Sequence, residues 1–471
     1  MTLAEATPEL DIARNDRNDR NDRAFLGHPK GLGYLAFTET WERFSYYGMQ
    51  TLLVLYMVNE LLLPGHVENI AGFEAFRSLY GDIDGQKLAS AIFGTYTSLV
   101  YLTPILGGLL ADRVLGKRRT VMLGAITMAA GHFLMAFETS FLLALLCLIL
   151  GNGMFKGNIA SQVGALYGPD DLRRATAFQI FFLGINAAVI VSPLVVGTLG
   201  EQVGWHWGFG AAGVGMLIGL GVYIAGQKHL PEEHFDRRAG AGARAERPRL
   251  TATDWSALIA LFLLIPVMAI GFLPNQQIFN AYLVWGDRQF DLTFMGTRLP
   301  TSWLITLDAI TSVSFLAIVA LFYSWYGKRR REPDEVTKMI IGSVFSIGGM
   351  LCLFMAASTT AEGEKIGLFW PVMFHLLNSI GFAHMLPVSL ALFAKVAPKA
   401  VNATVIGIYY LTFVAANGLV GYVGGWLETM PATTFWLMHA GFAAAAGAVF
   451  ILFKLFLSKR LVQSEPAPLP D

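Results

Sequence analysis

Residues 140–166 read SFLLALLCLILGNGMFKGNIASQVGAL. A helix rises about 1.5 Å per residue and the hydrocarbon core of a bilayer is about 30 Å thick, so roughly 20 apolar residues cross it. This run is long enough to cross a membrane as one helix, and it carries one charged side chain, Lys156. A helix is favoured because lipid cannot satisfy open backbone groups and the run shows no alternation of period two.

Eleven further runs share this length and apolar character, so we predict twelve membrane spans. Charged residues make up 14% of the 471-residue chain, against about 25% in soluble domains. The sequence therefore predicts an all-α polytopic membrane protein. The spans lie near 34–62, 86–111, 119–138, 140–166, 174–198, 205–226, 255–285, 301–326, 337–358, 366–393, 402–427 and 432–457.

The balance of charge and the cysteines exclude several classes of protein. Lys and Arg number 34, as do Asp and Glu, which excludes nucleic-acid binding through bulk positive charge. Cys147 and Cys352 both lie inside apolar runs, so neither a disulfide framework nor a cysteine metal site is expected. We predict no metal and no cofactor.

The basic residues predict the orientation, because cytoplasmic loops carry an excess of Lys and Arg. With the N-terminus inside, the inner loops and C-terminal tail hold 21 such residues and the outer loops hold five. Both termini are thus expected in the cytoplasm of a protein of the cell inner membrane. The expected segments are a disordered tail 1–30, a six-helix bundle 31–226, a cytoplasmic linker 227–254, a second six-helix bundle 255–458 and a tail 459–471.

Charges inside the spans are costly and usually face a partner or a wet cavity. Glu39, Glu42 and Arg43 fall within about 100° of one another around the first helix. Lys156 lies in the fourth span and Asp308 in the eighth. These three acids and two bases leave one acid in surplus, and burial favours its neutral form, so it can bind a proton.

A structural role for these groups is the alternative. The four charges of the first and fourth spans could simply hold helices together, although buried ion pairs are poor stabilisers. Asp308 could accept hydrogen bonds from a neighbouring helix. The span histidines His132, His375 and His384 show no metal-ligand spacing, and we interpret them as hydrogen-bonded packing residues.

The first span carries a motif that resembles a known family. Glu39-Thr-Trp-Glu42-Arg43-Phe-Ser-Tyr46-Tyr47-Gly48 resembles the ExxERFxYYG motif of the proton-coupled oligopeptide transporter (POT/PTR) family, within the major facilitator superfamily. Further stretches agree with the superfamily loop between helices two and three and with the family's fourth and fifth helices. They are Asp112-Arg113 with Gly116-Lys117-Arg118-Arg119-Thr120, Phe155-Lys156-Gly-Asn158-Ile, and Phe181-Phe182-Leu-Gly-Ile-Asn186.

The resemblance implies the major facilitator fold, with 12 transmembrane helices in two six-helix bundles that rock about a central site. It implies a proton-coupled symporter of di- and tripeptides rather than an enzyme. We expect the monomer to be the functional unit. Carried over, Arg43 and Lys156 hold the peptide carboxylate, and Glu39 and Glu42 couple protons. Asn186 binds the peptide, Tyr46, Tyr47 and Tyr101 line the site, and Asp112 and Arg113 form a cytoplasmic loop motif.

The second half departs from the family pattern at its acids. The family usually has a second arginine after the first-span motif, and this position is Gln50 here. That arginine often pairs with a glutamate on helix seven, where this sequence reads Asn275-Gln276-Gln277 and has no acid. Helix ten, which normally offers a glutamate, reads Gly381-Phe-Ala-His384. Asp308 takes the place of a usual asparagine, so we predict that it serves gate protonation, ammonium binding, or both.

Two other readings of the function remain open. The same fold could move another small solute with protons, such as nitrate or an organic anion, because Arg43 and Lys156 suit any anion. An intramembrane enzyme is disfavoured by the lack of a His/Glu metal motif, a Gly-x-Ser-x-Gly turn or a phosphate loop in the sequence. For the transport cycle we expect Lys156 to pair with a first-span glutamate when the site is empty.

Overall fold

The computed structural model describes residues 22–168, 170–231, 250–361 and 363–456. Most of the tail predicted at 1–30, most of the linker predicted at 227–254 and all of the tail predicted at 459–471 lie outside these residues. The described part is almost entirely helical, with one short hairpin, β1 (Thr293–Phe294) and β2 (Thr297–Arg298), paired antiparallel.

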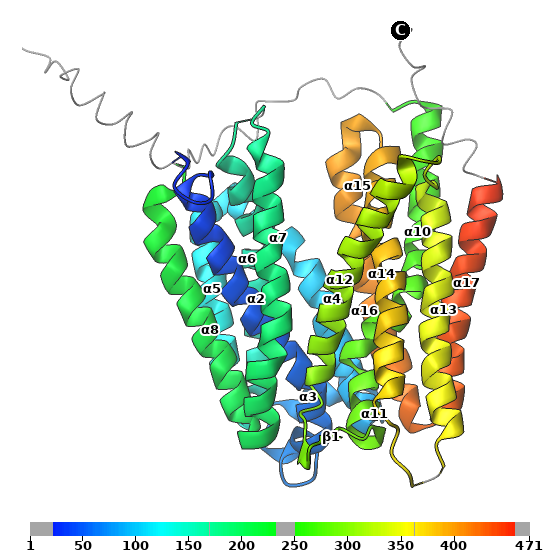
Figure 1. Cartoon of the computed structure of the whole chain (residues 1–471). Helices are drawn as coiled ribbons and strands as arrows, with labels where there is room; N and C mark the ends of the chain where they lie inside the picture. The colour runs from blue at the N-terminus through cyan, green and yellow to red at the C-terminus, as the bar shows by residue number, and fades with distance from the viewer. Residues whose placement is uncertain (1–21, 169, 232–249, 362, 457–471) are drawn as a thin grey trace, which may run out of the picture.

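Among the described residues, the first half of the molecule is built from six long helices, whose arrangement Figure 1 shows. The helix α7 continues through two π-helical turns to Val203, and the short α3 (Phe73–Arg77) lies in the loop after α2. The long helices are α2 (Lys30–Tyr56), α4 (Gly85–Leu110), α5 (Lys117–Leu134), α6 (Phe141–Ala165), α7 (Arg173–Ser192) and α8 (Trp205–Gly226).

The second half contains six spans, two of which are interrupted. They are α10 (Ala252–Gln276) with α11 (Ala281–Gln289), α12 (Trp303–Gly327), α13 (Glu335–Thr359), α14 (Phe369–Val396), α15 (Asn402–Tyr409) with α16 (Leu411–Gly424), and α17 (Ala432–Phe456). The run predicted as one helix over 255–285 is broken at Asn280, whose backbone is not helical. Pro274 lies just before this break and lacks the N–H that a helix interior requires.

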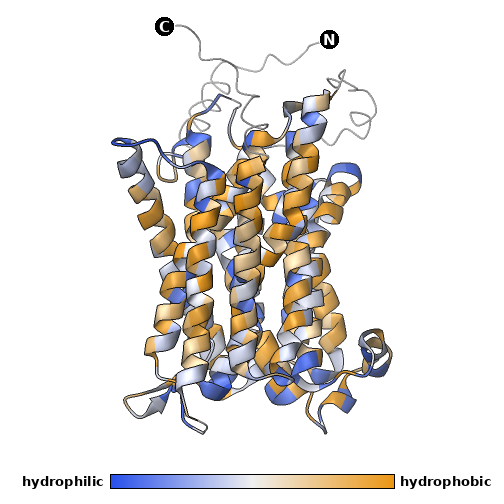
Figure 2. Ribbon diagram, turned by 90° about the vertical axis from the view of Figure 1, so that its right-hand side faces the viewer, coloured by the Kyte–Doolittle hydropathy of each residue, from blue (hydrophilic) through white to orange (hydrophobic). Residues whose placement is uncertain are grey.

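The fold agrees with the prediction of an all-helical membrane protein. Ten helices of the described residues are long and apolar enough to cross a bilayer. The helices α2 and α5 fall outside that group, since α2 carries Glu39, Glu42 and Arg43 and α5 begins with three basic residues. Figure 2 shows hydrophobic residues along the outward faces of the helices, with hydrophilic residues gathered toward both ends.

Close approach of helix backbones places the site residues. A Cβ atom on Gly107 of α4 would lie 1.9 Å from the carbonyl oxygen of Gly153 on α6, so only glycine fits there. On the other side of α4, a Cβ on Gly94 would lie 2.5 Å from the Cα of Gly421 on α16. The helix α4 therefore packs tightly against both halves, and α7 against α12 makes a second junction between them.

Hydrogen bonds between the halves gather toward the end of the molecule that carries the β1–β2 hairpin. Glu201, just after α7, accepts from the backbone N–H groups of Thr301 and Ser302 at 2.7 and 2.8 Å. The indole of Trp303 donates to Thr198 at 2.9 Å, and Ser90 on α4 donates to Asn280 at 3.1 Å. The two halves are thus joined at the hairpin end.

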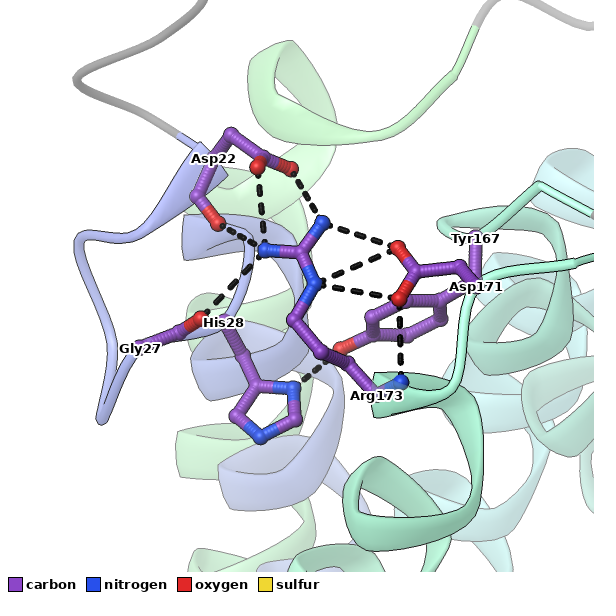
Figure 3. Close-up of polar contacts among 6 residues, drawn as sticks. All are labelled: Asp22, Gly27, His28, Tyr167, Asp171 and Arg173. Carbon is purple, nitrogen blue, oxygen red and sulfur yellow. Dashed lines mark hydrogen bonds and ion pairs between the residues drawn. The ribbon is translucent and has the colours of Figure 1, made fainter.

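At the opposite end, a polar cluster attaches the segment before α2 to the start of α7 (Figure 3). The guanidinium of Arg173 donates to Asp22 at 2.9 Å and to Asp171 at 2.8 Å. His28 and the hydroxyl of Tyr167 lie 2.9 Å apart in the same cluster. We call Asp22, Asp171 and Arg173 the Arg173 clasp.

Candidate substrate and proton site

The charged residues of α2 form a compact buried group. Arg43 Nε lies 3.0 Å from Glu39 Oε1 and 2.6 Å from Glu42 Oε2. Glu39, Glu42 and Arg43 are 4%, 0% and 3% exposed. The spacing of three and four residues places all three on one face of the helix, as the sequence predicts.

This group has hydrogen-bonding capacity left over. Within the described residues, neither Nη2 of Arg43 nor Oε2 of Glu39 has a hydrogen-bond partner, although both atoms are buried. Asn152 on α6 approaches Glu42 Oε1 with its amide at 3.5 Å. Buried polar groups are normally satisfied by protein, water or a ligand, so an anion at Arg43 Nη2 would complete the site.

Lys156 contributes a second cation from α6. Its ammonium lies 4.6 Å from the centroid of the Tyr101 ring, and it interacts electrostatically with Arg43, Glu42 and Glu39. The sequence predicts that Lys156 pairs with a first-span glutamate. Within the described residues, no glutamate oxygen lies within 4.0 Å of the Lys156 ammonium. Arg43 takes both glutamates instead, because it lies within one turn of them on the same helix.

Three tyrosines surround these charges. The Arg43 guanidinium carbon lies 5.2 Å from the centroid of the buried Tyr46 ring. Tyr47 stacks on Phe279 at 6.4 Å between centroids, and Tyr101 stacks on Phe413 at 5.2 Å. Since Phe279 and Phe413 belong to the second half, the tyrosines place the site at the junction of the two halves.

The remaining predicted residues of the first half lie apart from the charges. Asn186 is half-buried on α7, and no hydrogen bond joins it to another described residue. Asp112 and Arg113 are exposed in the π-helical turn Ala111–Leu115 that ends α4. The structure thus groups seven of the predicted residues, namely Glu39, Glu42, Arg43, Tyr46, Tyr47, Tyr101 and Lys156.

Asp308 has partners of its own in the second half. Its Oδ1 lies 3.0 Å from Nδ1 of His375 on α14, and His375 Nε2 lies 2.8 Å from the hydroxyl of Tyr282 on α11. The sequence predicts only a hydrogen-bonded packing role for His375. No spacing signal could have found this contact, because Asp308, His375 and Tyr282 come from three separate helices.

A possible metal-binding group lies outside this site. Ligand atoms of Glu60, His66 and Glu138 lie within 4.8 Å of one another near the ends of α2 and α6. The hydrogen bond to Glu138 raises the pKa of His66, which is the behaviour of an ion pair. None of these three residues contacts the charges around Arg43 among the described residues.

Comparisons with known proteins agree on one family. The model of the POT family matches residues 118–241 and 245–437. The chain is 30% identical to the transporter YclF of Bacillus subtilis over 93% of this chain and 96% of that protein. It is also 30% identical to a di-/tripeptide transporter of Lactococcus lactis subsp. cremoris, over 83% of this chain and 88% of that protein.

Solved structures give the same result. The crystal structure of a peptide transporter of this family in complex with sulfate superposes with a TM-score of 0.80 at 27% identity, covering 94% of this chain and 99% of that one. The crystal structure of a mutant of peptide transporter POT in complex with alafosfalin also gives a TM-score of 0.80, at 27% identity over 97% of this chain and 99% of that one. With its helices arranged as in these structures, the chain belongs to the POT family of membrane transporters.

Proposed function

We propose that this transporter is a proton-coupled symporter that imports di- and tripeptides by alternating access. The observation that carries the proposal is the buried group of Glu39, Glu42 and Arg43, with Lys156 on α6 supplying a second cation over the Tyr101 ring. Relatives named as peptide and di-/tripeptide transporters support the choice of substrate.

Charge balance provides the coupling. The two glutamates and two cations sum to zero, so the carboxylate end of a peptide alone, or a proton alone, leaves this group of four with a net charge, which is costly in a buried site. When the carboxylate reaches Arg43 and Lys156, one glutamate loses its partner and takes up a proton. The site is neutral again only when both ligands are bound.

The other predicted residues take supporting roles in this scheme. The tyrosines Tyr46, Tyr47 and Tyr101 line the site, and Asn186 hydrogen-bonds the peptide. Asp308 serves as a further proton or ammonium site in the second half. We place the protein in the cell inner membrane as a monomer with both termini in the cytoplasm, so the hairpin end faces outward.

The second candidate function is proton-coupled transport of another anion, such as nitrate. It is favoured by one observation: among the described residues, no acid of the second half contacts the charges around Arg43 to hold a peptide ammonium. Competition of labelled dialanine uptake by nitrate and by N-blocked dipeptides distinguishes the two candidates. Inhibition by nitrate with none by a dipeptide panel would favour the anion.

The test of the peptide scheme is uptake of dialanine into proteoliposomes under a pH gradient. Lys156→Ala removes one of the two cations, and we expect it to abolish accumulation. Lys328→Ala, which changes an exposed loop lysine, is the matched control and should accumulate like the wild type. Wild-type accumulation by Lys156→Ala contradicts the scheme.

A further inference from the structure

We propose that His375 is a proton-binding partner of Asp308 and that Tyr282 positions it, so that the three side chains act as one proton-binding unit. This inference rests on the proposed proton coupling and adds to it two residues for which the sequence analysis gave no role. It also places a proton site in the second half of the molecule, on helices that do not carry the Arg43 charges.

The geometry is that of a continuous hydrogen-bonded chain. Asp308 Oδ1 and His375 Nδ1 lie 3.0 Å apart, and His375 Nε2 and the Tyr282 hydroxyl lie 2.8 Å apart. His375 and Tyr282 are fully buried, whereas the Asp308 side chain is 15% exposed. This series of hydrogen bonds therefore begins at the partly exposed carboxylate of Asp308 and ends at the buried hydroxyl of Tyr282.

The two contacts of His375 fix its tautomer. An ionised Asp308 only accepts hydrogen bonds, so Nδ1 of a neutral His375 must carry the proton and donate it. Nε2 is then the acceptor for the Tyr282 hydroxyl. A proton that arrives can bind Asp308 or His375 Nε2, and in the second case the hydroxyl turns to accept, so the proton is shared by the pair.

The surroundings leave this pair without a competing charge. Between Phe178 and Ser192, the face of α7 that packs on α12 offers no ionisable side chain. The buried part of α13 carries Cys352, and on α17 the His439 ring meets Trp436 at 5.6 Å. Tyr282 contacts Trp436 and Phe374, so its ring lies among aromatic side chains.

One more buried polar group lies beside the unit. Asn378 follows His375 by three residues on α14 and is 1% exposed. Within the described residues neither atom of its amide has a hydrogen-bond partner. An amide with open donors and acceptors is a binding point for water, which would give protons a route to the pair.

The experiment separates exchange from proton-driven accumulation in proteoliposomes. His375→Asn keeps an amide near the position of Nδ1 but cannot titrate. We expect peptide counterflow close to that of the wild type, a different pH profile of uptake, and accumulation that falls to a ratio of about one because the gradient is no longer coupled. His439→Asn is the control, since His439 is equally buried but, among the residues that the structure describes, its one hydrogen-bond partner is the backbone oxygen of Phe435.

A second variant keeps the test decisive if His375→Asn loses counterflow. Tyr282→Phe leaves His375 in place and removes only the hydroxyl, so exchange should persist while the pH profile shifts. The double variant Asp308→Asn with His375→Asn should shift the pH profile of uptake no further than either single variant, because coupled residues are not additive.

The outcomes distinguish this inference from the proposed function. A wild-type pH profile and wild-type accumulation in His375→Asn overturn the inference and leave peptide symport standing. If His375→Asn fails to fold, a wild-type pH profile of uptake in Tyr282→Phe overturns the inference instead. If the unmodified protein accumulates no peptide under a pH gradient, it is the proposed function that fails.

Discussion

Arg43 is the side chain on which the ion pairs of α2 converge, since both glutamates lie against its Nε. Its Nη2 has no partner among the described residues, so the outer edge of the guanidinium can receive a carboxylate while Nε stays paired with one of the two glutamates. The planar guanidinium of an arginine can bind partners on two edges at once, whereas the ammonium of a lysine cannot.

Arg43→Lys therefore keeps the positive charge and tests the geometry of the guanidinium. We expect dialanine uptake to fall by about tenfold or more, because the loss of one charge-assisted hydrogen bond weakens binding by about 1.5–3 kcal/mol. Initial rates of uptake in proteoliposomes measure it. An unchanged rate would show that charge alone suffices at this position.

At the scale of elements, the contact of Glu201 with the start of α12 joins the two halves at the hairpin end. Its carboxylate accepts from two backbone N–H groups of that helix start, which suits the positive end of a helix dipole. Neighbouring Gly197 packs directly on Ser302, where a Cβ would lie 2.0 Å from its hydroxyl. The contact is therefore both charged and tightly packed.

Glu201→Gln should weaken this junction and favour opening of the hairpin end. An amide can accept one of the two hydrogen bonds but turns its own donors toward the other N–H. Distances between spin labels on the ends of α8 and α12 measure the change, and we expect a larger open population than in the wild type. Gln202→Ala, which removes only an exposed bond to Arg298, is the control and should leave the distribution unchanged.

The Arg173 clasp ties the segment before α2 to α7 at the other end (Figure 3). Arg173→Gln should speed hydrogen exchange at residues 22–28 while α2 stays protected. The hydrogen bonds from Arg173 hold the pKa of Asp171 below its usual value. The clasp therefore stabilises the fold above the ordinary pKa of aspartate and is lost as the pH falls through the depressed value. Equal hydrogen exchange at residues 22–28 in the wild type and in Arg173→Gln would show that the clasp does not hold this segment.

At the scale of the whole molecule, the sequence predicted the spans better than their interruptions. Length and hydropathy identify ten crossings within the described residues, because lipid imposes both. The break at Asn280 escapes this logic, since the run 255–285 is long and mostly apolar. At the break, the Gln277 side chain accepts from the backbone N–H of Ala281 at 3.4 Å, and the Asn280 amide donates to the carbonyl of Val420 on α16 at 3.2 Å.

The site was predictable only where its residues share a helix. Glu39, Glu42 and Arg43 meet through their spacing, which the sequence displays. The predicted pairing of Lys156 with a first-span glutamate is not found among the described residues, because Arg43 lies within one turn of both glutamates on α2 and pairs with them itself. The contact of Asp308 with His375 depends on the packing of α12 against α14, which no local pattern encodes.

The central claim is that one carboxylate and one proton enter the buried charges together. The most direct measurement is the external pH change when dialanine or its C-terminal amide is added to proteoliposomes that contain the wild-type protein. We predict that dialanine is taken up with protons, so the exterior becomes more alkaline, and that the amide produces neither uptake nor a pH change. Dialanine uptake without proton movement, or equal transport of the amide, would contradict the account.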